Sequence, residues 1–161
     1  MVTMRADGNT VAVSAPYNAE FVTAAKALKG RWDPDKKVWV FAVEQREAVT
    51  RLITEHYGMD PTGENRTVDL DVYLKDGEIP LRELTVAGRT LLIRWEKYED
   101  VKSGRDVKIT GGKFEGKGGS ARRPQIGPVQ GVRLLVRNWP ESAIAMLENS
   151  EYVAKVVRRQ I

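Results

Sequence analysis

The chain of 161 residues contains no cysteine and only one histidine. Disulfide bonds and thiolate metal sites are therefore excluded, and two of the residue types most often used as nucleophile and base are nearly absent. No stretch approaches the roughly 20 consecutive apolar residues of a membrane-spanning helix. The first residues, MVTMRADGNT, lack the apolar run of a signal peptide. We therefore expect a soluble, cytoplasmic protein that needs no membrane and no cofactor.

What the chain does have is a local excess of positive charge. Its net charge is +4, but residues 102–161 carry 12 basic and 5 acidic side chains, whereas residues 59–101 carry 6 basic and 10 acidic ones. A local excess of cations attracts polyanions, because phosphate groups bind where positive charges can neutralise them. The charge distribution favours nucleic acid as the partner, and an acidic protein surface is the other possibility.

The order of the predicted elements indicates an α+β protein in two parts. Residues 1–58 predict a β-α-β-β-α module, in which Asn18 caps the first helix and Gly30 closes it. The polar segment 59–67 predicts a linker, because it contains proline and glycine and no apolar period. Residues 68–161 then show the period of two that is typical of strands, which predicts a mostly antiparallel, β-rich domain.

A glycine-rich segment, GGKFEGKGGSARRPQIGPVQG, lies at residues 111–131. It contains seven glycines and two prolines and has few side chains to bury, so ordering it costs much entropy. We predict a long, flexible, basic loop that contacts phosphates. The candidate residues of this region are Lys108, Lys113, Lys117, Arg122 and Arg123. A solvated linker without a ligand is the alternative for the same composition.

The stretch KGRWDPDKKVWVF, residues 29–41, places aromatic and basic side chains around a turn. Trp39 and Phe41 fall on one face of a predicted strand, so we assign them to the core. Trp32 is expected in a partly exposed position, where its ring could stack on a base of a single strand. The candidates for nucleic-acid binding here are Lys29, Arg31, Trp32, Lys36 and Lys37. An ordinary solvated face is the alternative for the basic residues.

The longer stretch YNAEFVTAAKALKGRWDPDKKVWVF resembles the HARP domain of eukaryotic annealing helicases and a short related domain found beside primases of plasmids and phages. The shared pattern is a helix, an aromatic residue before aspartate (Trp32), a turn with a basic residue (Lys37), and two aromatic residues one position apart (Trp39 and Phe41). The resemblance covers residues 11–57 and implies recognition of single-stranded or branched DNA. It implies no remodelling activity, because the chain has no ATPase motor.

The acidic residues and the histidine are poor candidates for catalysis. Asp69 and Asp71 lie two apart on a predicted strand and point the same way, as half of a Mg²⁺ site would. Asp106 and Glu115 are similar to elements of some nucleases, but the glycine-rich segment around Glu115 is poorly suited to hold ligands in place. His56 has no partner nearby in the sequence. We expect solvated carboxylates, no catalytic residues, no metal site and no enzymatic activity.

These observations favour a non-catalytic nucleic-acid-binding protein of phage or plasmid type, with single-stranded or branched DNA preferred and RNA left open. The alternative is a protein-binding inhibitor or accessory factor of a nucleic-acid-processing complex, of phage or plasmid type, whose basic surface docks on an acidic partner. Salt dependence distinguishes the two, because direct binding to nucleic acid weakens log-linearly as salt rises. The sequence leaves the oligomeric state open.

Overall fold

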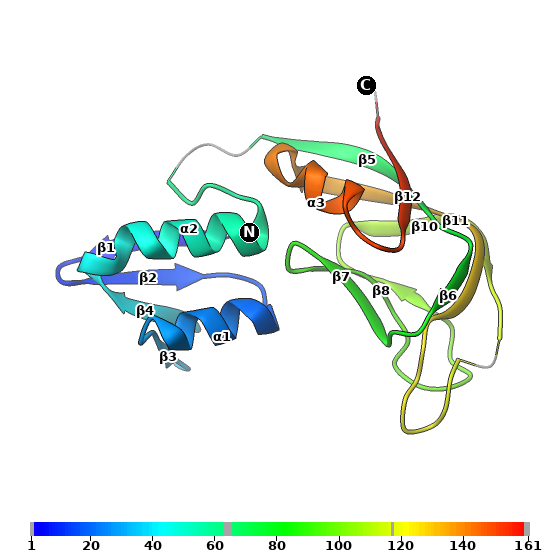
Figure 1. Ribbon diagram of the computed structural model, residues 1–161, viewed down its shortest axis with the longest axis horizontal. Helices are drawn as coiled ribbons and strands as arrows, with labels where there is room; N and C mark the ends of the chain where they lie inside the picture. Colours follow the sequence, from blue (N-terminus) through cyan, green and yellow to red (C-terminus); the bar gives the residue numbers. More distant parts are fainter. Residues whose placement is uncertain (1, 63–65, 117, 160–161) are drawn as a thin grey trace. The chain divides into compact units, whose positions relative to one another are not determined.

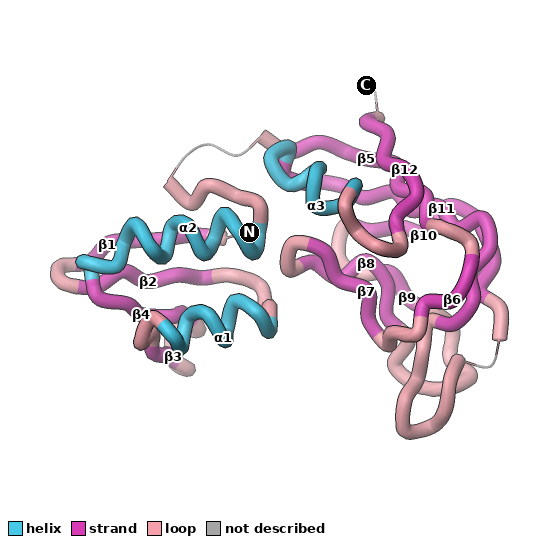
Figure 2. The backbone as a smooth tube through the Cα atoms, viewed as in Figure 1, coloured by secondary structure: helices cyan, strands magenta, loops and turns pink. Residues whose placement is uncertain are grey.

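The computed structural model describes residues 2–62, 66–116 and 118–159, so Lys117 and part of the predicted linker lie outside the described residues. The chain divides into two compact units, Met1–Asn65 and Arg66–Ile161. Each unit combines helices with antiparallel sheets (Figures 1 and 2), which confirms the predicted α+β class.

The N-terminal unit is a four-stranded antiparallel sheet in the order β1-β2-β4-β3, accompanied by two helices (Figure 1). Its elements are β1 (Thr3–Asp7), β2 (Thr10–Ser14), α1 (Ala19–Ala27), β3 (Arg31–Asp33), β4 (Val38–Ala42), the 3₁₀ turn η1 (Val43–Gln45) and α2 (Arg46–Tyr57). The sequence did not predict β1, which pairs with β2 at the edge of the sheet. Of its five side chains, only that of Met4 packs on the core, so no apolar alternation marks this strand.

One face of this sheet and both helices enclose the first hydrophobic core. The cross-strand pair Val13 and Trp39 lies on this face, where Trp39 is 9% exposed and Phe41 is 2% exposed. The assignment of Trp39 and Phe41 to the core is therefore confirmed. From the helices, Phe21 and Tyr57 meet edge to face with their ring centroids 5.3 Å apart. Burial raises the pKa of the Tyr57 phenol, which is a consequence of this packing.

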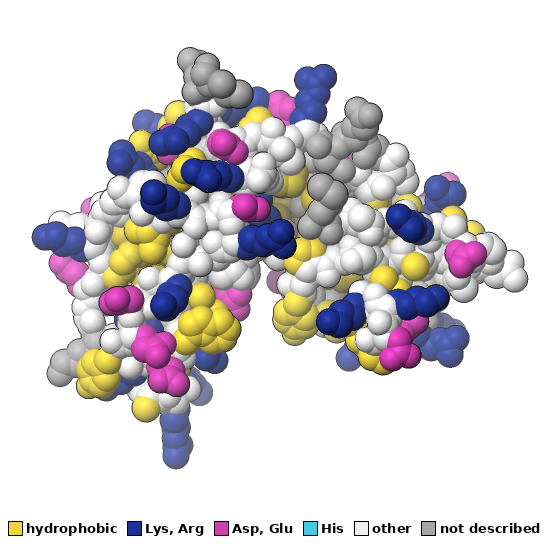
Figure 3. Space-filling model, turned by 180° about the vertical axis from the view of Figure 1, so that it is seen from behind, with side chains coloured by type: hydrophobic (Ala, Val, Ile, Leu, Met, Phe, Trp, Pro, Cys, Tyr) yellow, Lys and Arg dark blue, Asp and Glu magenta, His cyan; other side chains and the backbone are white. Residues whose placement is uncertain are grey.

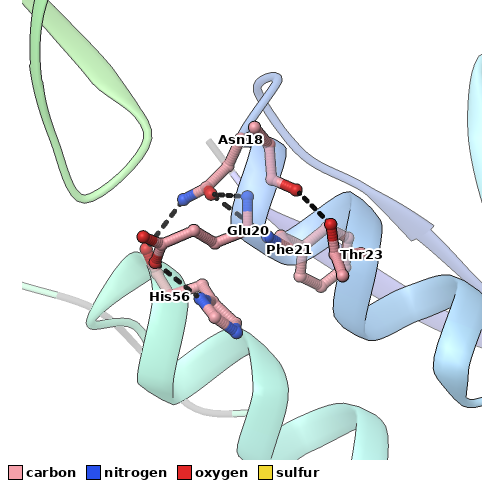
Figure 4. A network of polar contacts seen from close by, with 6 residues as sticks. Asn18, Glu20, Phe21, Thr23 and His56 are labelled. Atoms are coloured by element: carbon pink, nitrogen blue, oxygen red, sulfur yellow. Dashed lines mark hydrogen bonds and ion pairs between the residues drawn. The ribbon is translucent and has the colours of Figure 1, made fainter.

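Asn18 caps α1 as predicted, and it also ties the start of α1 to the end of α2 (Figure 4). Its Oδ1 accepts hydrogen bonds from the backbone N–H groups of Glu20 and Phe21, both at 3.1 Å, and its Nδ2 donates to the carbonyl of His56 at 3.3 Å. The Glu20 carboxylate lies 3.9 Å from Nδ1 of His56. The single histidine therefore has a structural position between the two helices.

The C-terminal unit places a large antiparallel sheet and a small one around a second core. The large sheet has the order β10-β11-β5-β12, with β6 beside β11, and the small sheet has the order β7-β8-β9. The elements are β5 (Thr67–Leu74), β6 (Gly77–Ile79), β7 (Glu83–Val86), β8 (Arg89–Ile93), β9 (Lys102–Ser103), β10 (Val107–Phe114), β11 (Gly127–Pro140), the 3₁₀ turn η2 (Glu141–Ala143), α3 (Ile144–Glu148) and β12 (Val153–Arg158). Leu70 and Leu134 of the large sheet share this core with Leu91 and Leu92 of the small sheet. The other face of the large sheet is turned to solvent.

The prediction of a flexible loop over residues 111–131 is wrong at both ends of that range. Strand β10 continues to Phe114 and β11 begins at Gly127. Ile126 and Val129 are buried, although the composition of the segment suggested that it had almost nothing to bury. What connects the two strands is therefore shorter and better anchored than the composition indicated.

Two glycines of this segment, Gly111 and Gly112, lie at a bulge in the ladder between β10 and β11. Gly112 has a φ of +95°, and a Cβ atom at this position would lie 2.4 Å from the Cα atom of Val132. The register between β10 and β11 shifts on both sides of Gly111. A bulge at this place needs a residue that tolerates positive φ and allows a close backbone approach, and glycine meets both needs.

Arg94 anchors the connection between β10 and β11 from inside the unit. Its side chain is 6% exposed and donates to the carbonyls of Gln125 at 2.6 Å and Ile126 at 2.9 Å, and also to the carbonyl of Glu99. A Cβ atom on Gly118 would lie 2.7 Å from Cδ of Arg94, so the chain passes close to the arginine. These contacts hold the connection in place, because a buried guanidinium must keep its hydrogen-bond acceptors.

Candidate nucleic-acid interface

The five candidates of the N-terminal unit lie along one edge of its sheet, from the end of α1 through β3 to the turn before β4. All five are exposed: Lys29, Arg31, Trp32, Lys36 and Lys37. Asp33 shapes the turn, because its Oδ1 accepts hydrogen bonds from the backbone N–H groups of Asp35 at 3.0 Å and Lys36 at 3.2 Å. The short turn keeps the two lysines next to the edge strand.

The end of α1 differs from the prediction by one residue. Lys29, and not Gly30, adopts the left-handed conformation after the helix, with a φ of 61°. Gly30 has a different reason to be glycine, because a Cβ atom there would lie 2.5 Å from the ring of Phe41. The glycine that was assigned to helix termination therefore makes room for the core, and Lys29 carries its charge into solvent at the helix end.

Trp32 is half exposed, as predicted, with 49% of its surface accessible. It pairs with Trp39 across β3 and β4, and the two ring centroids lie 5.6 Å apart. Trp32 therefore covers part of the core tryptophan and leaves the rest of its ring for a ligand. Its neighbour Arg31 lies on the opposite face of the sheet, in register with Val40. The structure thus separates these two candidates.

The basic residues predicted in the glycine-rich segment do not form one flexible arm. Lys108 and Lys113 belong to β10. Arg122 and Arg123 lie in an exposed turn that is closed by two backbone hydrogen bonds of 3.1 and 3.2 Å. Lys117 lies outside the described residues. Of these candidates, Lys108 pairs with Leu135 and lies on the solvent-facing side of the large sheet, where other cations also lie.

Those other cations come from the solvent-facing side of the large sheet, which we call the basic sheet face. Its cations are Lys108, Arg133, Arg137, Lys155 and Arg159, and the same face holds Tyr73, Leu135, Val157 and the carboxylate of Asp71. In the view of Figure 3, Lys and Arg side chains gather on the surface of the C-terminal unit. Lys155 lies over the ring of Tyr73, with its Nζ 5.6 Å from the ring centroid.

Strand pairing produces two rows of side chains across this face. One row runs from Arg133 on β11 through Tyr73 on β5 to Lys155 on β12. The next row runs from Lys108 on β10 through Leu135 on β11 and Asp71 on β5 to Val157 on β12. Leu135 is 5% exposed although it lies outside the hydrophobic cluster between the two sheets, which is the burial expected where the stems of long side chains surround an apolar one.

Most cations of the basic sheet face have no carboxylate partner. Arg159 forms an ion pair with Asp71, with 3.3 Å between Nε and Oδ2. Among the described residues, the other four form no ion pair, and Arg133 donates through Nε to the hydroxyl of Thr110 at 3.1 Å. Unpaired cations that are close together are able to neutralise phosphate charges without first breaking an internal salt bridge.

Arg89 donates to the carbonyl of Arg137, a residue of this face, but the contacts of its own side chain are structural. Its guanidinium carbon lies 4.9 Å from the centroid of the Trp139 ring. It donates to the carbonyls of Arg137 and Asn138, both at 3.0 Å. Burial lowers the pKa of Arg89, and the nearby charge of Asp106 opposes that change. The arginine joins the small sheet to β11 at the point where the ladder of β11 is irregular.

The residues that sequence reasoning missed are Tyr73, Arg133, Arg137, Lys155 and Arg159. Their signal was present as alternation: in GVRLLVRNW, two arginines stand four positions apart among buried residues, which places them on the same face of a strand. The sequence does not tell which strands pair with one another, so the face that β5, β10, β11 and β12 form together could not be predicted.

The carboxylates of β5 have ordinary structural contacts. Asp69 accepts a hydrogen bond from the backbone N–H of Asn138 at 3.1 Å, and Asp71 pairs with Arg159. In the part of the chain that the structure describes, no group of three or more His, Asp or Glu residues could hold a metal ion. None of the described helices is long and apolar enough to cross a membrane.

No family model, no curated protein and no solved structure matches the chain. The resemblance of residues 11–57 to the HARP domain therefore stays a prediction.

Proposed function

We propose that the protein binds single-stranded nucleic acid, DNA foremost, without catalysing a reaction on it, and that the basic sheet face of the C-terminal unit makes the main contact. The observation that carries this proposal is the row of Arg133, Tyr73 and Lys155 across three strands. A cationic surface that holds an aromatic ring is what a single strand requires, because every linkage carries a charge and every base has a stacking face.

A flat sheet suits a single strand better than a duplex. Reading a duplex usually requires an element that enters a groove, most often a helix. The described helix of the C-terminal unit, α3, has five residues and packs with Leu147 in the core. A sheet with an aromatic platform instead accommodates bases that are already unstacked. We therefore propose a preference for single strands and for the unpaired parts of branched DNA.

The edge of the N-terminal unit supplies a second, weaker contact in this proposal. Trp32 is the half-exposed ring, and Lys36 and Lys37 extend from the adjacent turn. Because Arg31 lies on the opposite face of the sheet from Trp32, the cations of this edge do not share one orientation, and we assign to it a smaller share of the affinity than to the basic sheet face.

The test measures fluorescence anisotropy of a labelled single-stranded DNA oligonucleotide at 50, 100 and 200 mM salt. We expect binding that weakens log-linearly with salt, and a slope that Arg133→Ala lowers by about 0.7, the value for one phosphate contact on a single strand. Arg158→Ala is the matched control. Arg158, on β12, is an exposed arginine like Arg133, but its Nη1 forms an ion pair with Oε1 of Glu141 at 2.8 Å. The control variant should keep the wild-type slope.

Two results would contradict the proposal. The first is no detectable binding to single strands or forks at low salt, which would leave the protein-binding inhibitor or accessory factor as the better account. The second is an equal effect of Arg133→Ala and Arg158→Ala, which would show that only the total charge matters.

A further inference from the structure

A pocket of about 450 Å³ lies on the solvent-facing side of the small sheet of the C-terminal unit. This volume falls within the range of small-ligand sites in proteins. The pocket is lined by residues of β7, β8 and β9, by Trp95 after β8, and by Gly104 and Arg105 after β9. It is separate from the residues of the basic sheet face, so the proposed function does not account for it.

Strand pairing determines the floor of the pocket. Glu83 on β7 pairs with Ile93 on β8, and Ile93 pairs with Lys102 on β9. These three side chains therefore form a row across the sheet, with the carboxylate at one end, the ammonium group at the other and an apolar side chain between them. Two strand spacings separate the charged ends, which places their backbones about 10 Å apart. Glu83 and Lys102 both line the pocket and form no ion pair with each other.

Trp95 provides the aromatic wall. It is 54% exposed, although an indole ring of this size is usually mostly buried. Arg82 holds its position relative to the ring, because its Nη2 donates to the carbonyl of Trp95 at 2.9 Å and its guanidinium carbon lies 5.4 Å from the ring centroid. The ring is therefore oriented before any ligand arrives, with a cation already beside it.

The charges of the pocket are asymmetric. Three cations, Arg82, Lys102 and Arg105, line it together with the single carboxylate of Glu83. Among the described residues, none of the three cations forms an ion pair. Glu83 accepts a hydrogen bond through Oε1 from the hydroxyl of Thr90, which orients the carboxylate and leaves Oε2 for another donor. An anion with a flat apolar body and a hydrogen-bond donor matches this set of groups.

We propose that this pocket binds one nucleotide whose base carries an amino group. The base stacks on Trp95, the amino group donates to Glu83, and the phosphate pairs with Lys102 and Arg105. The inference deepens the proposed function and rests on it for the class of ligand. The nucleotide is either free or the terminal unit of a strand, since both present the same base and phosphate.

Glu83 gives the pocket its selectivity. Guanine presents an amino group beside a ring N–H on one edge, and the amino group is able to donate to the free Oε2 of Glu83. Uracil and thymine present carbonyl oxygens on either side of their single N–H, and these oxygens face the carboxylate unfavourably. Guanine nucleotides should therefore bind more tightly than uracil nucleotides.

The experiment uses the ¹⁵N-labelled full chain and follows the indole N–H signal of Trp95, assigned with a Trp95→Phe variant. The ligands are GMP, UMP, guanosine, and a short single-stranded DNA with a terminal dG. We expect GMP to shift this signal and to bind about tenfold more tightly than UMP or guanosine, the order of magnitude of one charge-assisted hydrogen bond. Trp95→Ala should lower GMP affinity at least about tenfold, the value of one stacking contact.

Two further variants make the test specific. Glu83→Gln should bring the affinities for GMP and UMP to within about threefold of each other, because the amide no longer offers a charged acceptor. Tyr17→Ala is the control for an exposed aromatic ring outside the pocket, since Tyr17 is 80% exposed in the N-terminal unit, and it should leave GMP binding unchanged. A shift by the DNA alone would assign the pocket to strand ends, and a shift by GMP alone would assign it to a free nucleotide.

Failure of this inference is distinguishable from failure of the proposed function. If single-stranded DNA binds but neither GMP nor the terminal dG moves the Trp95 signal, the pocket proposal is wrong and the binding function stands. If GMP binds with the predicted dependence on Glu83 and long single strands do not bind at all, the pocket proposal stands and the proposed binding of single strands is wrong. Equal affinity for GMP and guanosine would also overturn the pocket proposal.

Discussion

The two units of this protein carry their exposed cations in different ways. In the N-terminal unit they follow one another along the chain, from Lys29 at the end of α1 to Lys37 in the turn before β4. In the C-terminal unit they are far apart in the sequence, and the pairing of β10, β11, β5 and β12 brings Lys108, Arg133 and Lys155 onto one face.

This difference shows that a charge run and a charge surface are distinct features. A run is easy to see in a sequence, but its side chains point in several directions, as Arg31 and Trp32 do on opposite faces of β3. A surface that is assembled from several strands has no run, but its members share one orientation. For a ligand with regularly spaced charges, the assembled surface offers more simultaneous contacts.

The largest expected effect separates the two tryptophans of the N-terminal unit. Trp39→Ala should lower the free energy of unfolding of that unit by about 3–5 kcal/mol, the range for a large buried aromatic residue. Trp32→Ala should cost about 1 kcal/mol, because it removes one aromatic contact from a half-exposed position. Chemical denaturation followed by circular dichroism measures both. Equal losses for the two variants would mean that Trp32 is a core residue and is not available to a base.

A smaller effect is expected in the bulge between β10 and β11. Gly112→Ala should destabilise the C-terminal unit by about 1–3 kcal/mol or more, since it places a side chain at positive φ against the backbone of Val132. Gly111→Ala is the matched control, because a Cβ atom there meets nothing within 4 Å. Thermal unfolding of both variants provides the comparison. Tolerance of alanine at residue 112 would restore the prediction of a flexible loop.

The smallest expected effect concerns the lysines of the N-terminal edge. Replacing both Lys36 and Lys37 by alanine should reduce the salt slope of single-strand binding by about 0.7 for each phosphate contact that is lost. Their exposed positions in a turn predict little effect on stability. An unchanged slope would show that this edge is an ordinary solvated surface and that the C-terminal unit binds alone.

Much of the fold was predictable because it depends on local patterns. The period of two identified β5, β10 and β11, and the cap at Asn18 fixed the start of α1. Strand β1 was not predicted because this exposed edge strand has no apolar alternation. The extent of the loop in segment 111–131 was misjudged because glycine content was taken as the mark of a loop, whereas Gly112 lies within β10, and Gly112 and Gly118 make room for Val132 and Arg94.

The candidate site was less predictable than the fold. Trp32 was placed correctly because turn and strand registers are local properties. The basic sheet face depends on which strands are neighbours, and strand order is decided by tertiary packing. The pocket at Trp95 depends on the same long-range pairing, since Glu83, Ile93 and Lys102 meet only through two strand registers.

The most direct test of the main claim is a map of the binding surface by NMR. The ¹⁵N-labelled full chain is titrated with a single-stranded DNA oligonucleotide at low salt, and the amide shifts are followed for both units. We expect the largest shifts at outward-facing residues of β5, β10, β11 and β12, among them Tyr73, Arg133 and Lys155, and smaller shifts around Trp32. Shifts confined to the N-terminal unit, or no shifts in either unit, would contradict the main claim.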